Sequence, residues 1–99
     1  MWYVIIGEDV QDSLSLRKQH REAHLSRISV LQNQGRVLAA GPTPNNDTDT
    51  IDGNSFSGSV MIVDFPDLAA AEKWADDDPY VTGGVFAAVT VKPFIKVLP

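Results

Sequence analysis

The sequence contains no cysteine. Disulfides, thiolate metal sites and cysteine nucleophiles are therefore all excluded, and such a chain suits a reducing compartment. Long apolar runs are missing as well: the amino-terminal stretch at residues 2–6 is far too short for a signal peptide or a bilayer span, and no basic segment precedes it. We therefore expect a cytoplasmic protein without a membrane partner.

Basic residues are scarce. Eight lysines and arginines stand against thirteen acidic residues, which gives a net charge of −5. This balance repels a phosphate backbone, so nucleic acid is not an expected partner. A chain of 99 residues that is 43% hydrophobic and has no internal repeat is typical of one globular domain, which we place at residues 1–99.

Hydrophobic periodicity predicts four strands and two helices. Strand patterns are rich in β-branched and aromatic residues, whereas the long helix repeats Leu25, Ile28 and Leu31 on one face. The predicted strands are residues 2–6, 36–40, 58–65 and 85–91, and the predicted helices are residues 14–34 and 68–77.

Turn and cap residues separate these elements. Ser13 or Asp12 is placed to cap the first helix, and Gly35 is placed to end it in a left-handed conformation. Gly41-Pro42 is expected to stop the second strand. In a second group, Asp67 is expected to cap the second helix, Pro79 to end it, and Pro93 to confine the last strand to a sheet edge.

The predicted order βαββαβ indicates an α+β protein of the ferredoxin-like plan, with an antiparallel four-stranded sheet and two helices on one face. Successive residues of a strand point to opposite faces of the sheet, and the predicted strands carry apolar residues at both odd and even positions. The sheet face without helices is therefore also expected to be apolar. We expect a homodimer that covers this open face, sheet against sheet. The alternative is a monomer whose tail, residues 94–98, folds back over it.

Three basic side chains fall on the inward face of the first helix. At 100° per residue, Arg17, Arg21 and His24 share the stripe of the helix's apolar residues. Arginine is rarely buried without an anionic partner, so this placement predicts either a ligand site or an internal ion pair. A single inward histidine by itself would more commonly be a hydrogen-bonded structural residue.

Antiparallel helices bring the first half of one helix to the end of the other. Asp78 and Tyr80 follow the second helix, and Ser59 begins the third strand at the same end of the molecule. A carboxylate that fixes the tautomer of His24 would fit it for proton transfer, with Asp78 as the catalytic partner. The substrate-binding candidates are Arg17, Arg21, Ser59 and Tyr80, which suit a small anionic molecule.

Metal chemistry has weaker support. His20 and His24 have the i, i+4 spacing of a metal clamp, but no HExxH pattern is present and His20 lies at the margin of the stripe. Gly83-Gly84 does not have the spacing of a phosphate loop. We expect neither a metal nor a cofactor.

A series of short motifs resembles a known family. In order they are Arg21-Glu22-Ala23-His24-Leu25, Gly41-Pro42, Gly58-Ser59, Asp78-Pro79-Tyr80 and Lys92-Pro93-Phe94. The series is similar to that of the YciI-like, YCII-related family in the dimeric α/β-barrel superfamily. The resemblance implies a ferredoxin-like dimer with His24 and Asp78 as its active-site pair, and a relative that is a dehydrochlorinase of a chlorinated hydroxyquinol.

Two functions remain open at this level. One is a small lyase, isomerase or hydrolase that uses His24 and Asp78 for acid–base chemistry on an anionic or cyclic, hydroxyquinone- or lactone-like substrate. The other is a non-catalytic dimeric module that binds a small metabolite in the same place. A purely structural ion network is a third interpretation, and it predicts a large loss of stability when Asp78 is removed.

Overall fold

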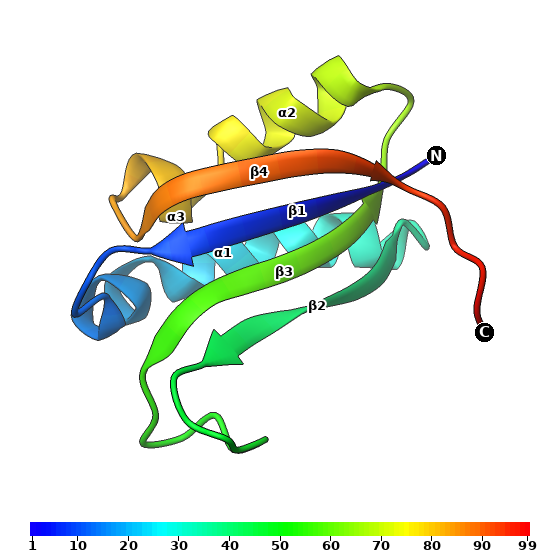
Figure 1. Cartoon of the computed structure of the whole chain (residues 1–99). Coiled ribbons are helices and arrows are strands. Elements are labelled where there is room, and N and C mark those ends of the chain that lie inside the picture. Colours follow the sequence, from blue (N-terminus) through cyan, green and yellow to red (C-terminus); the bar gives the residue numbers. More distant parts are fainter.

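The computed structural model describes residues 1–99. The elements follow in the order β1 (Trp2–Asp9), α1 (Leu14–Asn33), β2 (Val37–Pro44), β3 (Phe56–Asp64), α2 (Leu68–Asp76), α3 (Pro79–Thr82) and β4 (Phe86–Phe94) (Figure 1). The strands form one antiparallel sheet in the order β2-β3-β1-β4. The predicted ferredoxin-like α+β fold is therefore confirmed.

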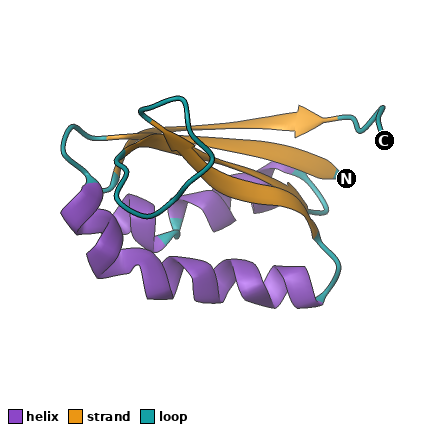
Figure 2. Ribbon diagram, turned by 90° about the horizontal axis from the view of Figure 1, so that it is seen from below, coloured by secondary structure: helices purple, strands orange, loops and turns teal.

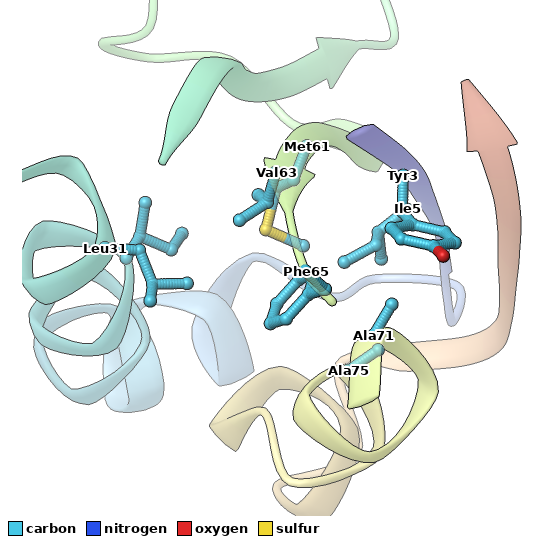
Figure 3. Close-up of a cluster of buried hydrophobic side chains, with 9 residues drawn as sticks. Tyr3, Ile5, Leu31, Met61, Val63, Phe65, Ala71 and Ala75 are labelled. Carbon is cyan, nitrogen blue, oxygen red and sulfur yellow. The ribbon is translucent and has the colours of Figure 1, made fainter. Parts of the chain in front are cut away.

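All helices lie on one side of the sheet (Figure 2). The core fills the space between these layers and contains Tyr3 and Ile5 of β1, Met61 and Val63 of β3, and Ile28 of α1, among nine buried residues. Figure 3 shows Ile5 and Phe65 turned toward Ala71 and Ala75 of α2, whose small size lets this helix approach the sheet closely. Along β3, Met61 and Val63 alternate with more exposed residues and are both turned toward this core.

The other side of the sheet carries no helix. Strand register places Val4 of β1 between Ile62 of β3 and Lys92 of β4 on this side. Its large apolar residues, here called the open face, are Trp2, Val4, Ile6, Val60, Ile62 and Phe94.

The carboxyl-terminal tail does not cover the open face. Ile95, Val97 and Leu98 are each about four-fifths exposed, at 79%, 81% and 82%. The tail leaves the end of β4 and runs away from the sheet (Figure 1). The monomeric alternative with a folded-back tail is therefore not the arrangement of this structure.

One boundary prediction was wrong, and another was incomplete. Gly41-Pro42 does not stop the second strand, because β2 is an edge strand in which a proline need not donate a ladder hydrogen bond, and pairing continues to Pro44 opposite Phe56. Pro79 does not merely end a helix: it is the first residue of α3. Proline suits that position because the first helical N–H groups have no internal partner.

The predicted caps had mixed outcomes. Gly35 has a φ of 73° after α1, and the side chain of Asp67 accepts a hydrogen bond from the Ala70 N–H, as predicted. Ser13 is the N-cap residue of α1 but makes no side-chain cap. Its hydroxyl donates instead to the carboxylate of Asp9 at the end of β1. The first helix is thus anchored to the neighbouring strand at the edge of the candidate site.

Candidate functional site

His24 and Asp78 form a buried pair between α1 and the start of α3. The His24 Nδ1 and the Asp78 Oδ1 are 2.8 Å apart, and their side chains are 7% and 1% exposed. His24 lies in the middle of α1, on the same face as Ile28 and Leu31, which enter the core. The predicted meeting of this imidazole with this carboxylate is present in the structure.

Asp78 is held in place because it also caps α3. Its Oδ1 accepts the Tyr80 N–H at 2.8 Å, and its backbone has the extended conformation of an N-cap residue. The sequence Asp78-Pro79-Tyr80 therefore builds a short helix whose cap is the partner of His24. The Oδ2 of Asp78 is buried and has no hydrogen-bond partner, so the interactions of this carboxylate are concentrated on Oδ1.

Tyr80 forms a wall against the imidazole. The two rings are stacked, with centroids 3.8 Å apart and planes 5° from parallel, and Phe86 meets Tyr80 edge-on at 5.6 Å. Burial raises the pKa of the Tyr80 hydroxyl above its usual value, although the positive charge of Arg17 opposes this shift. Tyr80 is therefore neutral at physiological pH, and its ring fixes the plane of His24.

The second ring nitrogen of His24 is available. Nε2 makes no hydrogen bond, and it is not one of the buried unpartnered atoms, which are Arg27 Nη1 and Asp78 Oδ2. Since Nδ1 is occupied by Asp78, any proton exchanged with a ligand must pass through Nε2. His24 also lines a cleft, so this nitrogen has somewhere to meet a ligand.

The cleft lies between α1 and the β2–β3 side of the sheet, with a volume of about 450 Å³. Residues 45–55, which connect β2 and β3, bend down beside it toward the helix layer (Figure 2). Its floor includes Ser59 and Met61 of β3, and Tyr80 closes one end. The predicted site residues Arg17, Arg21, His24, Ser59 and Tyr80 all line this single cleft, and Asp78 lies directly behind His24.

Arg17 is committed mainly to the protein itself. Its Nε and Nη2 donate to the two carboxylate oxygens of Asp9 at 2.6 and 2.9 Å, and Nη2 also donates to the Gly58 carbonyl and the Ser59 hydroxyl. The Arg17–Asp9 pair is almost completely buried, with side-chain exposures of 8% and 2%. Only Nη1 has no partner within the chain, so Arg17 has one nitrogen left for a ligand.

Aromatic rings enclose the same guanidinium. Its central carbon is 5.1 Å from the ring centres of both Phe56 and Tyr80, and 6.0 Å from that of Phe86. Such contacts stabilise a desolvated cation. Arg17 of α1 thus contacts β1, β3, α3 and β4 around the cleft and holds Ser59 and Tyr80 in position.

Arg21 has a different environment. It is exposed at the rim of the cleft, next to Lys18, and it makes no hydrogen bond or ion pair within the chain. A free guanidinium at the mouth of an apolar cleft is suited to bind an anion in bidentate geometry. The carboxylates of Asp76 and Asp77 do not reach either arginine; Asp77 instead pairs with Lys73 on the surface of α2.

Asp9, Phe56 and Phe86 were missed in the sequence. Asp9 has the same parity along β1 as the inward-facing Tyr3 and Ile5, and that parity was a usable signal. The two phenylalanines gave no such signal, because an aromatic residue at a strand end is typical of an ordinary core. Their position around Arg17 depends on how β3 and β4 meet α1 in space.

The structure also bears on metal binding and on membrane spans. No group of three or more histidine, cysteine or acidic side chains is arranged to hold a metal ion. None of the helices has the length and apolar content that crossing a bilayer requires.

Comparison with known proteins gives consistent matches along almost the whole chain. YciI of Escherichia coli is 48% identical over 97 residues, covering 98% of this chain and 99% of that protein. An uncharacterised protein of Haemophilus influenzae is 46% identical over the same length.

A solved structure resembles the fold closely. It is that of 5-chloro-2-hydroxyhydroquinone dehydrochlorinase from Burkholderia phenoliruptrix, in complex with 2,5-dihydroxybenzoquinone, and it superposes with a TM-score of 0.85 at 27% identity over 96% of this chain and 94% of that one. The model of the YCII-related domain family matches residues 1–95. The chain therefore belongs to the YCII-related family.

Proposed function

We propose that this protein is a small acid–base enzyme whose reactive atom is the Nε2 of His24. The observation that supports the proposal is the buried His24–Asp78 pair, in which Nδ1 is occupied at 2.8 Å, Nε2 makes no hydrogen bond, and His24 lines the cleft. Asp78 fixes the tautomer that leaves Nε2 unprotonated, which is the form that accepts a proton. Tyr80, stacked on the ring, keeps its orientation.

The proposed substrate is a small anionic or cyclic molecule. Arg21 at the rim supplies a free positive charge, and the Ser59 hydroxyl on the floor, already accepting from Arg17, retains a proton to donate. Nε2 would take a proton from the substrate's O–H or C–H bond. The electron pair of that bond would form an enolate or expel a leaving group such as chloride, while the imidazolium pairs with Asp78.

The related dehydrochlorinase supports a hydroxyquinone-like substrate, because that enzyme acts on 5-chloro-2-hydroxyhydroquinone and its structure holds 2,5-dihydroxybenzoquinone. The test is to incubate the purified protein with 5-chloro-2-hydroxyhydroquinone and related hydroxyquinones, and to measure chloride release and ring-proton exchange. His24→Asn should lower the rate by at least about 100-fold, the usual contribution of a positioned acid–base group.

The chain offers a matched control in its other histidine. His20 does not line the cleft and packs against Gly83, so His20→Asn should keep the wild-type rate. Equal loss in both variants, or full activity in His24→Asn, would refute the catalytic role of His24. Melting temperatures of both variants would separate lost chemistry from lost folding.

A non-catalytic binding module is the second candidate. It is favoured by the position of Arg21, which could hold an anion without help from the imidazole. In that case ligands would raise the melting temperature of His24→Asn as much as that of the wild type, in proportion to RT ln(1 + [L]/Kd), and no turnover would be found.

We also propose that two copies of the chain associate through the open face. Val4, Ile6 and Ile62 lie side by side there without cover from any helix or from the tail. Apolar patches of this kind mark interaction sites, and an isologous two-fold pairing is the simplest closed arrangement.

A further inference from the structure

The charges of the cleft are unequally distributed along α1. Lys18 and Arg21 belong to the amino-terminal half of the helix, whereas the residues that line the cleft beyond His24 are Leu25, Ile28, Ser29 and Gln32. None of these four carries a charge. Along α1 the lining of the cleft therefore passes from a cationic end to a neutral, largely apolar end, with His24 at the boundary between them, while Asp52 of the β2–β3 connection is the one acidic residue of the lining.

The cleft continues well past the imidazole. At 1.5 Å per residue, the eight residues from His24 to Gln32 correspond to about 12 Å along the helix. A cavity of about 150 Å³ is enough for a benzene molecule. The volume here, about 450 Å³, is three times larger and falls in the range of sites that hold drug-sized ligands. A single ring at His24 would leave the neutral end unfilled.

Two large apolar side chains that line the cleft, one from α1 and one from the β2–β3 connection, are left exposed. Leu25 of α1 is 45% exposed and Ile51 of the β2–β3 connection is 48% exposed, although both line the cleft. Ile28 and Met61 also line the cleft and are buried. A ligand with an apolar body would cover Leu25 and Ile51, and each methylene that it removes from water would strengthen binding.

We infer that the substrate is an elongated amphipathic anion. Its carboxylate or phenolate head would lie at Arg21 and the Nε2 of His24, and its apolar body would extend along Leu25, Ile28 and Ile51 toward Gln32. This inference rests on the proposed function, since it places the reacting head at the same imidazole. It adds that affinity grows with the length of the apolar body.

The test uses a series of 4-alkylbenzoates, from benzoate through the ethyl and butyl compounds to 4-hexylbenzoate, titrated calorimetrically into the full-length protein. Each added methylene should lower Kd by about two- to fourfold, the binding expected for a buried CH₂. Arg21→Gln should weaken every member of the series by the same factor, about tenfold, because it removes a charge-assisted bond to the head. His24→Asn should preserve the dependence on chain length.

Leu25→Ser and Val30→Ser form the matched pair of variants. Both residues are exposed leucine or valine side chains on α1, but Leu25 lines the cleft and Val30, at 57% exposure, does not. Leu25→Ser should weaken butyl- and hexylbenzoate by at least fivefold and leave benzoate within twofold. Val30→Ser should behave as wild type with every compound, and melting temperatures will show that both variants are folded.

The outcomes separate this inference from the proposed function. A Kd that does not change with alkyl length, failure of the whole series to bind, or equal effects of Leu25→Ser and Val30→Ser would overturn the amphipathic ligand. A length-independent Kd would still be compatible with His24-dependent turnover. A clear length dependence without any turnover would support the ligand class while refuting the enzymatic role.

Discussion

Arg17 and His24 lie on the same face of α1, seven residues apart, and burial affects them in opposite ways. The guanidinium keeps its charge and therefore needs the buried Asp9 carboxylate, with which it forms a two-bond pair. The imidazole can lose its charge and needs only one acceptor, which Asp78 supplies. The arginine is consequently fixed in the wall of the cleft, while the histidine keeps one nitrogen free for chemistry.

Asp78 combines two functions that substitution can separate. Asp78→Ala removes both the α3 cap and the acceptor of His24, which together should cost about 2–4 kcal/mol of unfolding free energy. Asp78→Asn retains an acceptor oxygen for both bonds and should cost only about 1 kcal/mol, since asparagine caps helices as well as aspartate. Urea denaturation will measure both losses.

The activity of the same two variants tests the interpretation as a purely structural network. If Asp78 orients His24 for proton transfer through its negative charge, the asparagine variant should lose turnover although it remains folded. Wild-type turnover in Asp78→Asn would contradict this role. Near-wild-type stability in Asp78→Ala would contradict the capping and pairing observed here.

Tyr80 should make the protein sensitive to alkaline pH. Its folded-state pKa is raised above the ordinary tyrosine value of 10.0, mainly by burial, so folding favours the protonated hydroxyl. This stabilising contribution is fully present below the unfolded pKa and is lost as pH rises through the folded pKa. The unfolding free energy of the wild type should therefore fall above about pH 10, and Tyr80→Phe should reduce that fall.

The measurement is urea unfolding of both proteins between pH 8 and pH 11, together with tyrosinate absorbance. The chain has only two tyrosines, so the absorbance of Tyr80→Phe reports Tyr3 alone and the difference reports Tyr80. Identical pH dependence in the two proteins would show that burial of Tyr80 does not control its ionisation.

At the level of elements, the type and order of the long helices and strands could be predicted from the sequence, whereas the short helix beside the candidate site could not. Helix α1, predicted at 14–34, is observed at Leu14–Asn33, because its apolar repeat and Gly35 both follow simple local rules. Helix α3 was missed because four residues are too few to show a period. Its cap, Asp78, and its first residue, Pro79, were visible, but they were interpreted as the end of α2.

The candidate site was predictable where it depends on helix periodicity and topology, as for His24 and Asp78. It was not predictable where the role of a residue depends on which side chain it pairs with. Arg17 was assigned to a substrate, but its strongest partner is Asp9, eight residues earlier and on another element. Which carboxylate a buried arginine selects depends on distances in three dimensions, and neither composition nor spacing contains them.

Glycine is required at position 58, where β3 lies between β1 and β2. It pairs with Glu8 of β1 and Thr43 of β2, and a Cβ at this position would collide with the carbonyl oxygen of Gly7. Because the backbone of β1 cannot shift easily, Gly58→Ala should lower the free energy of unfolding by about 1–3 kcal/mol or more. The Gly58 carbonyl also binds Arg17, so the cleft should be disturbed as well.

Gly41 gives the matched control. It lies on the neighbouring strand β2 and has nothing within 4 Å of an added Cβ. Gly41→Ala should change stability by no more than about 0.5 kcal/mol, as is usual for an uncrowded surface position. Urea midpoints measured side by side decide the matter: comparable losses in the two variants would mean that the close approach of β1 and β3 is not the cause.

At the scale of the whole molecule, two apolar surfaces remain after the core is built. One is the cleft beside α1, which is narrow, lined by charges at one end and suited to a small molecule. The other is the open face, which is broad and presents Val4 and Ile62 side by side, with Lys92 of β4 next to Val4. The difference in shape and charge is why we assign the cleft to a substrate and the open face to a second copy of the chain.

The proposed homodimer can be broken by one charge at the centre of the open face. Ile62 is paired with Val4 and Ala39, and Ile62→Lys would bury like charges opposite one another in a two-fold interface, a strongly unfavourable arrangement. Light scattering should give twice the 10.8 kDa chain mass for the wild type and a single chain mass for the variant. Val30→Lys places the same charge on an exposed helix position and should remain dimeric. A wild-type protein that is monomeric at micromolar concentration, or an Ile62→Lys variant that stays dimeric, would show that the open face is not the interface.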